Sequence, residues 1–157
     1  MDGLTLLQQA REAGLAVKAE ADKLVIRGPK CAEPVALLLI ESKPKVLAAL
    51  GEAGAWQARH REALAHWGVL HPANEAAQLA WREMQVRWHF LHGQRVPEWQ
   101  CAGCGERIGG QRALDLGRGA RVHFETLNCL RRYGDRWRRD ATEWLFAMGL
   151  KPPAEAQ

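Results

Sequence analysis

The chain has 157 residues, a net charge of +4 and a mean hydropathy of −0.33. This length suits one domain or two small ones and excludes a large enzyme scaffold, while the mild basicity only weakly favours an anionic partner. The longest apolar run, Val35 to Ile40, is too short to span a bilayer, and Met1 to Leu4 show no export signal, so we expect a cytoplasmic protein without a membrane partner.

Composition changes along the chain and predicts a boundary. Five of the six lysines lie in the first fifty residues, whereas all seven tryptophans lie from Trp56 onward. The shift falls near Gly51 to Gly54. We therefore predict a small domain over residues 1–50 and a second part over residues 51–157.

The first fifty residues predict the element order α-β-β-α-α. Apolar residues at helical spacing from Leu4 to Ala13 indicate a helix that Gly14 ends. Alternating patterns over 15–19 and 23–27 indicate a β-hairpin. Pro34 then opens a helix, and Ser42 caps a last helix, Lys43 to Leu50. The residues that we expect to form a docking hairpin are Leu15, Val17, Leu24 and Ile26.

The residues that recur in this stretch are Leu and Gln before Gly14, K-L-x-I-R-G-P ending at Pro29, and P-K-V-L-x-x-L ending at Leu50. The pattern resembles the N-terminal docking domain of TubC-type megasynthases. That resemblance implies a unit that forms homodimers and offers its hairpin to a short partner segment. One edge strand would then pair with the partner by β-augmentation. The same apolar stripes also fit a self-contained core, and both interpretations stay open.

The middle of the chain predicts two antiparallel helices. The first runs through Trp67 and ends at Gly68, and the second starts after Pro72 and ends at Gly93. An apolar stripe steps by four and three residues along the second helix: Ala77, Trp81, Met84, Trp88 and Leu91. A tryptophan stripe at this spacing favours core packing over a base-stacking platform. His89 and His92 are interpreted as surface or capping residues.

Four soft ligands in the C-terminal third predict a structural Zn²⁺ site. They follow the spacing C-x2-C-x18-H-x5-C, and they are Cys101, Cys104, His123 and Cys129. Three thiolates and one imidazole form a complete tetrahedral set, which is typical of a structural rather than a catalytic zinc ion. His89, His92 or an aspartate remain alternatives to His123 as the fourth ligand. Cys31 stands apart and is expected to be an ordinary buried thiol.

Short elements are expected to carry these ligands. Residues 107–110 and 113–116 predict two paired strands, residues 121–124 bring in His123, and a helix starting near Thr126 places Cys129 in its first turn. A knuckle, a hairpin and a ligand at a helix start resemble the treble-clef class of zinc domains. The run from Glu98 to Ala141 also resembles the zinc segment of uncharacterised proteobacterial proteins, which implies a mobile-element context.

The last predicted helix runs from Leu130 to Met148 with an inner face and a basic face. The inner face holds Leu130, Tyr133, Trp137, Ala141, Trp144, Leu145 and Met148. A row of arginines suited to phosphates holds Arg131, Arg132, Arg136, Arg138 and Arg139, and Arg118 and Arg121 extend it. A solvated helix face is the competing interpretation, because the net charge of the segment is small.

Together these patterns predict an α+β protein with an αββαα docking-like domain, a helical hairpin and a zinc-stabilised β-hairpin followed by a helix. The function we expect is that of a non-enzymatic adaptor that docks to a protein partner or to a copy of itself. One alternative is a nucleic-acid-binding accessory protein that uses the arginine row. A treble-clef nuclease is less favoured, because it needs an open metal position and the four ligands already close the site.

Overall fold

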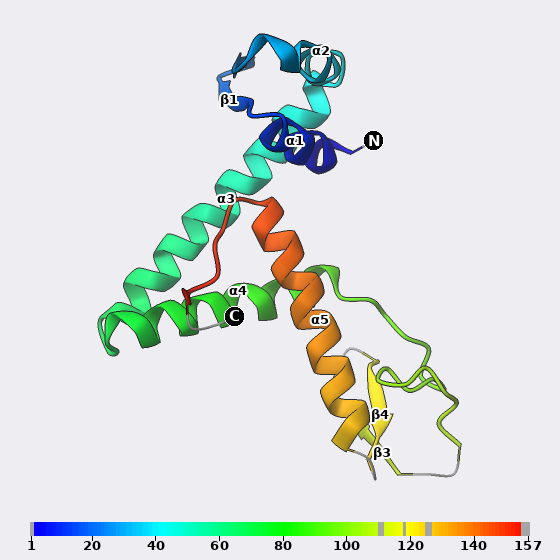
Figure 1. The fold of residues 1–157 in the computed structure, drawn as a ribbon. Helices are drawn as coiled ribbons and strands as arrows, with labels where there is room; N and C mark the ends of the chain where they lie inside the picture. The colour runs from blue at the N-terminus through cyan, green and yellow to red at the C-terminus, as the bar shows by residue number, and fades with distance from the viewer. Residues whose placement is uncertain (1, 110–111, 118, 125–126, 155–157) are drawn as a thin grey trace. The chain divides into compact units, whose positions relative to one another are not determined.

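The computed structural model describes residues 2–109, 112–117, 119–124 and 127–154. The fold is α+β, with two small antiparallel hairpins among the helices (Figure 1). Its elements, in chain order, are α1 (Gly3–Glu12), β1 (Ala16–Glu20), β2 (Lys23–Arg27), η1 (Lys30–Ala32), α2 (Glu33–Glu41), α3 (Lys43–Gly68), α4 (Ala73–His92), β3 (Ala113–Asp115), β4 (Arg121–His123) and α5 (Leu127–Ala147). None of the helices in the described part of the chain has the length and apolar content of a transmembrane segment.

The chain divides into two compact units. Unit 1 comprises Met1–Ala80 and Leu145–Gln157, and unit 2 comprises Trp81–Trp144. Both α4 and α5 therefore run from one unit into the other. Each unit has its own apolar cluster, centred on Leu6 and Leu39 in unit 1 and on Cys101 and Val122 in unit 2. The proposed separation at residues 51–54 falls within the first unit, inside α3.

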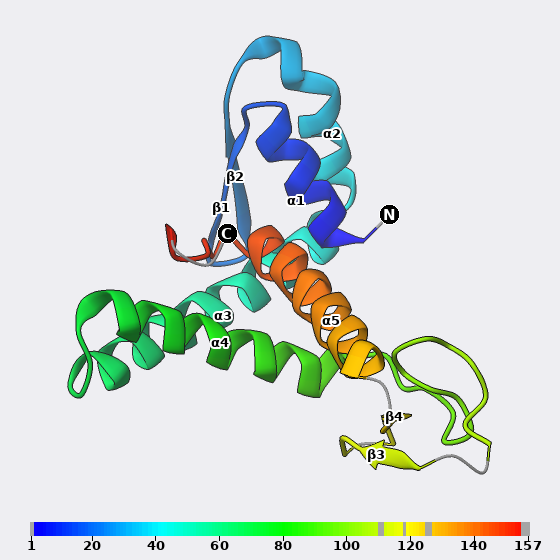
Figure 2. The ribbon, with the colours of Figure 1, turned by 60° about the horizontal axis from the view of Figure 1, so that its bottom comes forward.

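The first two elements of unit 1 form as their sequence predicts. The Asp2 carboxylate accepts a hydrogen bond from the Thr5 backbone N–H at 2.8 Å and caps α1. Gly14 adopts a φ of +75°, the left-handed conformation in which glycine ends a helix without strain. The chain then enters the hairpin of β1 and β2, which pairs Val17 with Ile26 and lies alongside α1 (Figure 2).

The hairpin side chains expected to dock a partner contribute to the core of unit 1. Leu15 is buried, and Val17, Leu24 and Ile26 are partly buried against a cluster that includes Leu6. Burial of these side chains against α1 stabilises a two-stranded hairpin that is marginal by itself. Their apolar character is therefore explained by packing within the unit, and docking through the hairpin stays a prediction.

The predicted end of the third helix at Leu50 is wrong, because α3 continues without interruption to Gly68. Gly51 and Gly54 favour a helix end by propensity, at about 1 kcal/mol each relative to alanine. Continued backbone hydrogen bonding and the burial of Ala53 and Trp56 in the next turns outweigh that cost. Ser42 precedes α3 as predicted, but its side chain makes no capping hydrogen bond.

The helix α4 confirms the predicted bounds of the second middle helix and most of its stripe. Trp81, Met84 and Trp88 are buried, as core packing requires. Leu91 departs from the stripe and is 56 % exposed in the last turn of α4. The tryptophans of this helix are therefore engaged in packing, not presented as a stacking surface.

The second hairpin pairs different segments from those predicted. β3 pairs with β4 and sets Leu114 opposite Val122, whereas residues 107–110 were expected to be the partner of 113–116. The backbone around Arg107 pairs with residues 99–100 instead. The Ile108 N–H donates to the Trp99 carbonyl at 2.7 Å, and Arg107 forms an antiparallel β-bridge with Gln100. Gly110, the end of the predicted strand, lies outside the described residues.

The helix α5 begins at Leu127, so Cys129 lies in its first turn as predicted, while Thr126 lies outside the described residues. Of the predicted inner face, Tyr133, Ala141, Leu145 and Met148 are buried, and Trp137 and Trp144 are half-buried. Leu130 is 36 % exposed, so its placement on the inner face is wrong.

Candidate metal centre

Four side chains from three elements meet in unit 2. The ligand atoms of Cys101, Cys104, His123 and Cys129 all lie within 4.8 Å of one another. The His123 Nδ1 lies 3.5 Å from the Cys104 Sγ and 3.7 Å from the Cys129 Sγ. Cys101 and Cys129 are buried, and the other two are half-buried. This cluster could hold a metal ion, and its three sulfurs and one nitrogen are the donor set of closed structural sites.

The first two ligands are held by a turn that the backbone closes on itself. The Gly105 N–H donates to the Cys101 carbonyl at 2.8 Å, and the Cys101 N–H donates to the Glu106 carbonyl at 2.8 Å. Gly105 has a φ of +81°, which other residues rarely adopt. The Gln100 side chain also donates to the Gly105 carbonyl at 2.8 Å. The glycine after the second cysteine thus allows both sulfurs to face the same point.

The turn is fastened to the hairpin and to α5, which bring the other two ligands. The Ala102 N–H donates to the Arg121 carbonyl on β4 at 2.8 Å, two residues before His123. The Arg136 guanidinium on α5 donates to the Ala102 carbonyl. Gly103 lies so close to the backbone of Cys129 that a side chain there would overlap it. These contacts position the ligands through the backbone.

The local electrostatics favour a thiolate at one cysteine. Burial by itself raises the pKa of the Cys101 thiol, but backbone N–H donors from Cys104, His123 and Gly103 outweigh burial and lower that pKa to about 6. Burial, together with the neighbouring Cys101 and Cys129 sulfurs, raises the pKa of the Cys104 thiol. A cation among the sulfurs favours thiolates at every cysteine, because metal ligation releases the protons.

His123 lies in the cluster, and the two alternative histidines lie in other surroundings. His89 is hydrogen-bonded through Nε2 to the Tyr133 hydroxyl at 2.9 Å and stacks on Trp137 with ring centroids 4.6 Å apart. His92 lies beside Trp144, with a centroid distance of 5.0 Å. The interpretation of His89 as a surface or capping residue is wrong. His89 lies on α4 and is half-buried against Tyr133 and Trp137 of α5.

Sequence reasoning missed the polar and aromatic contacts that join α4 to α5 within unit 2. Besides the stack of His89 on Trp137, the buried Gln85 side chain donates to the Thr142 hydroxyl at 3.0 Å. Burial raises the pKa of Tyr133. A glutamine beside the predicted apolar stripe was the available signal, but its partner on a helix 57 residues away was not visible in the sequence.

The predicted arginine row divides into residues with different surroundings. Arg138 pairs with Asp135 at 3.3 Å, and Arg139 approaches Asp140 at 3.7 Å. Arg131 and Arg132 are exposed, and no ion pair involves them among the described residues. Two more differ from the expected row: Arg136 donates to the Ala102 carbonyl in the turn that carries Cys101 and Cys104, and Arg121 is half-buried on β4. Arg118 lies outside the described residues.

Charge is concentrated in the unit that holds the cluster. Residues 81–144 contain twelve arginines, no lysine and eight acidic residues, so their formal charge of +4 equals that of the whole chain. The remaining residues contain ten basic and ten acidic residues.

Cys31 is exposed, which corrects the prediction of a buried thiol. It has no part in the four-residue cluster.

Comparisons with protein-family models, with curated proteins and with solved structures found no match. The docking-domain, treble-clef and mobile-element resemblances therefore remain expectations from the residues. What stands on structural observation is an α+β fold with a Cys₃His cluster that could bind a metal ion.

Proposed function

We propose that the protein is a non-enzymatic adaptor in which a structural zinc ion stabilises unit 2 as a binding module. The observation that carries this proposal is the convergence of three sulfurs and one imidazole nitrogen at the start of α5. Cys101, Cys104, His123 and Cys129 would hold the ion, and four protein ligands leave no position for a catalytic water. When bound, the ion would cross-link the turn, the hairpin and the helix and would not act as a Lewis acid.

Cobalt substitution tests whether the metal shell is closed. We expect the Co²⁺ form to show the intense visible absorption of a tetrahedral ion with sulfur ligands, and we expect added azide to leave the spectrum unchanged. Azide binding, seen as a shift of the visible bands, would reveal an open position and contradict the structural role. A Cys31→Ser variant is the matched control, because this thiol is exposed and outside the cluster.

The docking half of the proposal is supported by an apolar surface on unit 1. In α2, Leu37, Leu38 and Ile40 are 54 %, 43 % and 57 % exposed, which is unusual for large side chains on a nine-residue helix. Unit 1 has equal numbers of acidic and basic residues, so charge repulsion between two copies is small. A second copy of the chain is the occupant that this proposal assigns to the surface.

Light scattering during size-exclusion chromatography tests this self-association. We expect the protein to elute with twice its chain mass of 17.6 kDa, and the double variant Leu37→Glu, Ile40→Glu to elute as a monomer. Val69→Glu is the matched control, since Val69 belongs to the same unit and is 81 % exposed away from α2. A monomeric wild-type protein at high micromolar concentration would contradict self-docking.

A nucleic-acid-binding accessory role is the second candidate. It is supported by the excess of arginine in residues 81–144 and by the exposed positions of Arg131 and Arg132 on α5, which make no ion pair with another described residue. Contacts between arginine side chains and phosphates depend on charge and do not require a particular groove on the protein. Under this alternative both arginines contribute alike, and an oligonucleotide is a better ligand than any peptide.

A further inference from the structure

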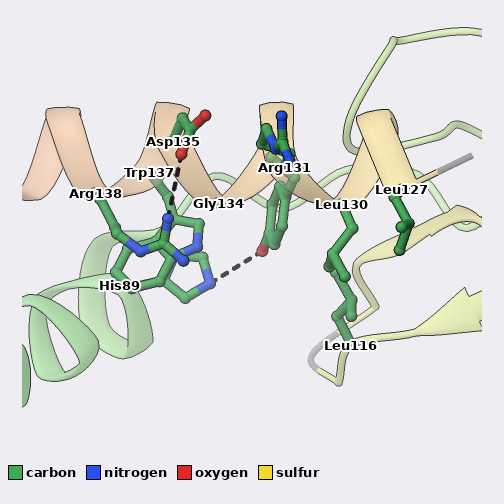
Figure 3. Close-up of a pocket in the computed structure, with 10 residues that line it drawn as sticks. His89, Leu116, Leu127, Leu130, Arg131, Gly134, Asp135, Trp137 and Arg138 are labelled. Carbon is green, nitrogen blue, oxygen red and sulfur yellow. Dashed lines mark hydrogen bonds and ion pairs between the residues drawn. The ribbon is translucent and has the colours of Figure 1, made fainter.

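A groove of about 740 Å³ lies along α5 in unit 2, and none of the residues that line it belongs to the Cys₃His cluster. It runs beside the exposed part of the helix between Leu127 and Arg138, with Leu116 from the β3–β4 turn and His89 from α4 on its other walls (Figure 3). Its volume lies within the range of pockets that take a ligand or several partner side chains.

The two ends of the groove differ in chemistry. Figure 3 shows Leu116, Leu127 and Leu130 gathered at one end, and His89, Trp137 and Arg138 at the other. Leu127 is 78 % exposed and Leu130 is 36 % exposed, so apolar surface at this end is open to solvent. An apolar partner that covers these leucine side chains removes apolar surface from water, which favours its binding here.

The charge at the groove selects an acidic partner. Arg131 and Arg138 both line it, and they lie two helical turns apart on the same side of α5. Arg138 pairs at 3.3 Å with Asp135, which also lines the groove, whereas no ion pair within the described part of the chain involves Arg131. Arg131 is therefore the charge that the groove offers to a partner's carboxylate. The net charge of +4 in residues 81–144 extends this preference over the module.

The aromatic side chains of the groove, Tyr133 and Trp137, are already engaged. Tyr133 is buried and is hydrogen-bonded to the His89 Nε2 at 2.9 Å. Trp137 is stacked against His89 at 4.6 Å, and the Arg138 guanidinium lies 5.3 Å from the Trp137 ring centroid. A base needs an aromatic face on which to stack, and leucine side chains offer none. The groove therefore favours an apolar side chain flanked by carboxylates over a nucleotide.

We propose that this groove binds an acidic amphipathic helix of a partner protein, an inference that rests on the adaptor function proposed above. The lined stretch of α5 from Leu127 to Arg138 is about 16 Å long, which corresponds to three helical turns of a partner. A leucine-type anchor enters the end formed by Leu116, Leu127 and Leu130. A carboxylate on a flanking turn meets Arg131. This is the helix-in-groove mode of recognition.

The test uses fluorescence anisotropy with the full-length, zinc-loaded protein and a labelled synthetic helical peptide. The peptide carries leucines at positions i, i+4 and i+7 and glutamates on the flanking positions. A peptide of the same composition with scrambled spacing, a peptide with lysine in place of glutamate, and a thymidine oligonucleotide are the comparison probes. We expect saturable binding of the acidic amphipathic peptide alone.

Matched variants locate the site. Arg131→Glu should weaken peptide binding about tenfold or more, while Arg132→Glu, the same charge change on an exposed neighbour that does not line the groove, should change it little. Leu127→Ser should weaken binding, and Leu91→Ser, the same substitution at a 56 % exposed leucine on α4, should not. Zinc content and thermal unfolding of every variant are measured on the same samples.

Each other outcome overturns the groove assignment. Equal losses in Arg131→Glu and Arg132→Glu indicate diffuse charge attraction, and stronger binding of the oligonucleotide indicates a nucleic-acid surface. No binding of the acidic peptide by a protein that holds one zinc ion rejects the groove and leaves the zinc-stabilised module in place. A protein that folds without zinc instead rejects the proposed function.

Discussion

Replacing Cys101 with serine is expected to abolish metal binding and to unfold the segment from Cys101 to the first turn of α5. Cys101 is 1 % exposed and belongs to both the four-residue cluster and the apolar core of unit 2. A structural zinc ion contributes on the order of 10 kcal/mol to folding, more than a core of this size supplies by itself. The loss should therefore remove protection from this segment altogether.

Hydrogen exchange read out by mass spectrometry, with metal content from native mass spectrometry, measures this effect. Amides of residues 101–129 should exchange rapidly in Cys101→Ser, while amides of α1 in unit 1 keep their protection, because its apolar cluster shares no residue with that of unit 2. The Cys31→Ser variant should behave as the wild type. Full metal content with unchanged exchange in Cys101→Ser would refute the role of the cluster.

Gly103→Ala is expected to lower metal affinity at least tenfold without removing a ligand. A Cβ at Gly103 would overlap the Cys129 carbonyl oxygen and would lie 2.6 Å from the Cys129 Cα. These are backbone atoms of the first turn of α5, so they cannot move aside as a flexible side chain does. The turn that carries Cys101 and Cys104 must therefore separate from the helix that carries Cys129.

Competition between the protein and a chromogenic zinc chelator measures this change in affinity. Gly109→Ala is the matched control, because nothing lies within 4 Å of a Cβ at that glycine. The control should retain the wild-type zinc affinity. Equal affinities for the two variants would show that the close approach of the turn to α5 does not hold the ligands in place.

We expect the Cys101→Ser variant to unfold part of unit 2 and to leave unit 1 folded, because the two units have different cores. Unit 1 buries large aliphatic side chains such as Leu6, Leu39 and Val46, which suffice for an apolar core. The core of unit 2 around the cluster consists mainly of small residues such as Ala102 and Ala120, with Val122 and Tyr133. In the proposed function, zinc ligation would compensate for the apolar area that this part of the chain lacks.

The elements that sequence reasoning predicted well are those with strong local signals. The end of α1 before Gly14, the hairpin of β1 and β2, and the bounds of α4 follow from periodicity and from turn residues. The metal cluster was predictable because the chain has only four cysteines and two of them, Cys101 and Cys104, have the C-x2-C spacing that is typical of metal sites. Each of these signals lies within a few residues of the structure that it specifies.

The errors arose where two local signals competed. Glycines at 51 and 54 indicated a helix end, but cooperative helix formation and burial of Trp56 carried α3 through them. The sequence pattern predicts a strand over residues 107–110. Instead, Arg107 pairs with Gln100 and the Ile108 N–H donates to the Trp99 carbonyl, next to the turn that carries Cys101 and Cys104. Leu130 was assigned to an inner face by periodicity alone, although part of its surface faces the groove.

The sequence by itself determined the three candidate cysteine ligands and the order of the elements that carry them, because thiolates and glycine turns have chemistry that spacing alone reveals. Only the tertiary structure decided that His123 rather than His89 joins the cysteines, since that choice depends on β4 pairing and on the stack of His89 against Trp137. The groove on α5 likewise exists only when the β3–β4 turn and α4 flank the helix. Contacts between residues far apart in the chain leave no periodic mark in the sequence, because each depends on where the backbone has already placed the other partner.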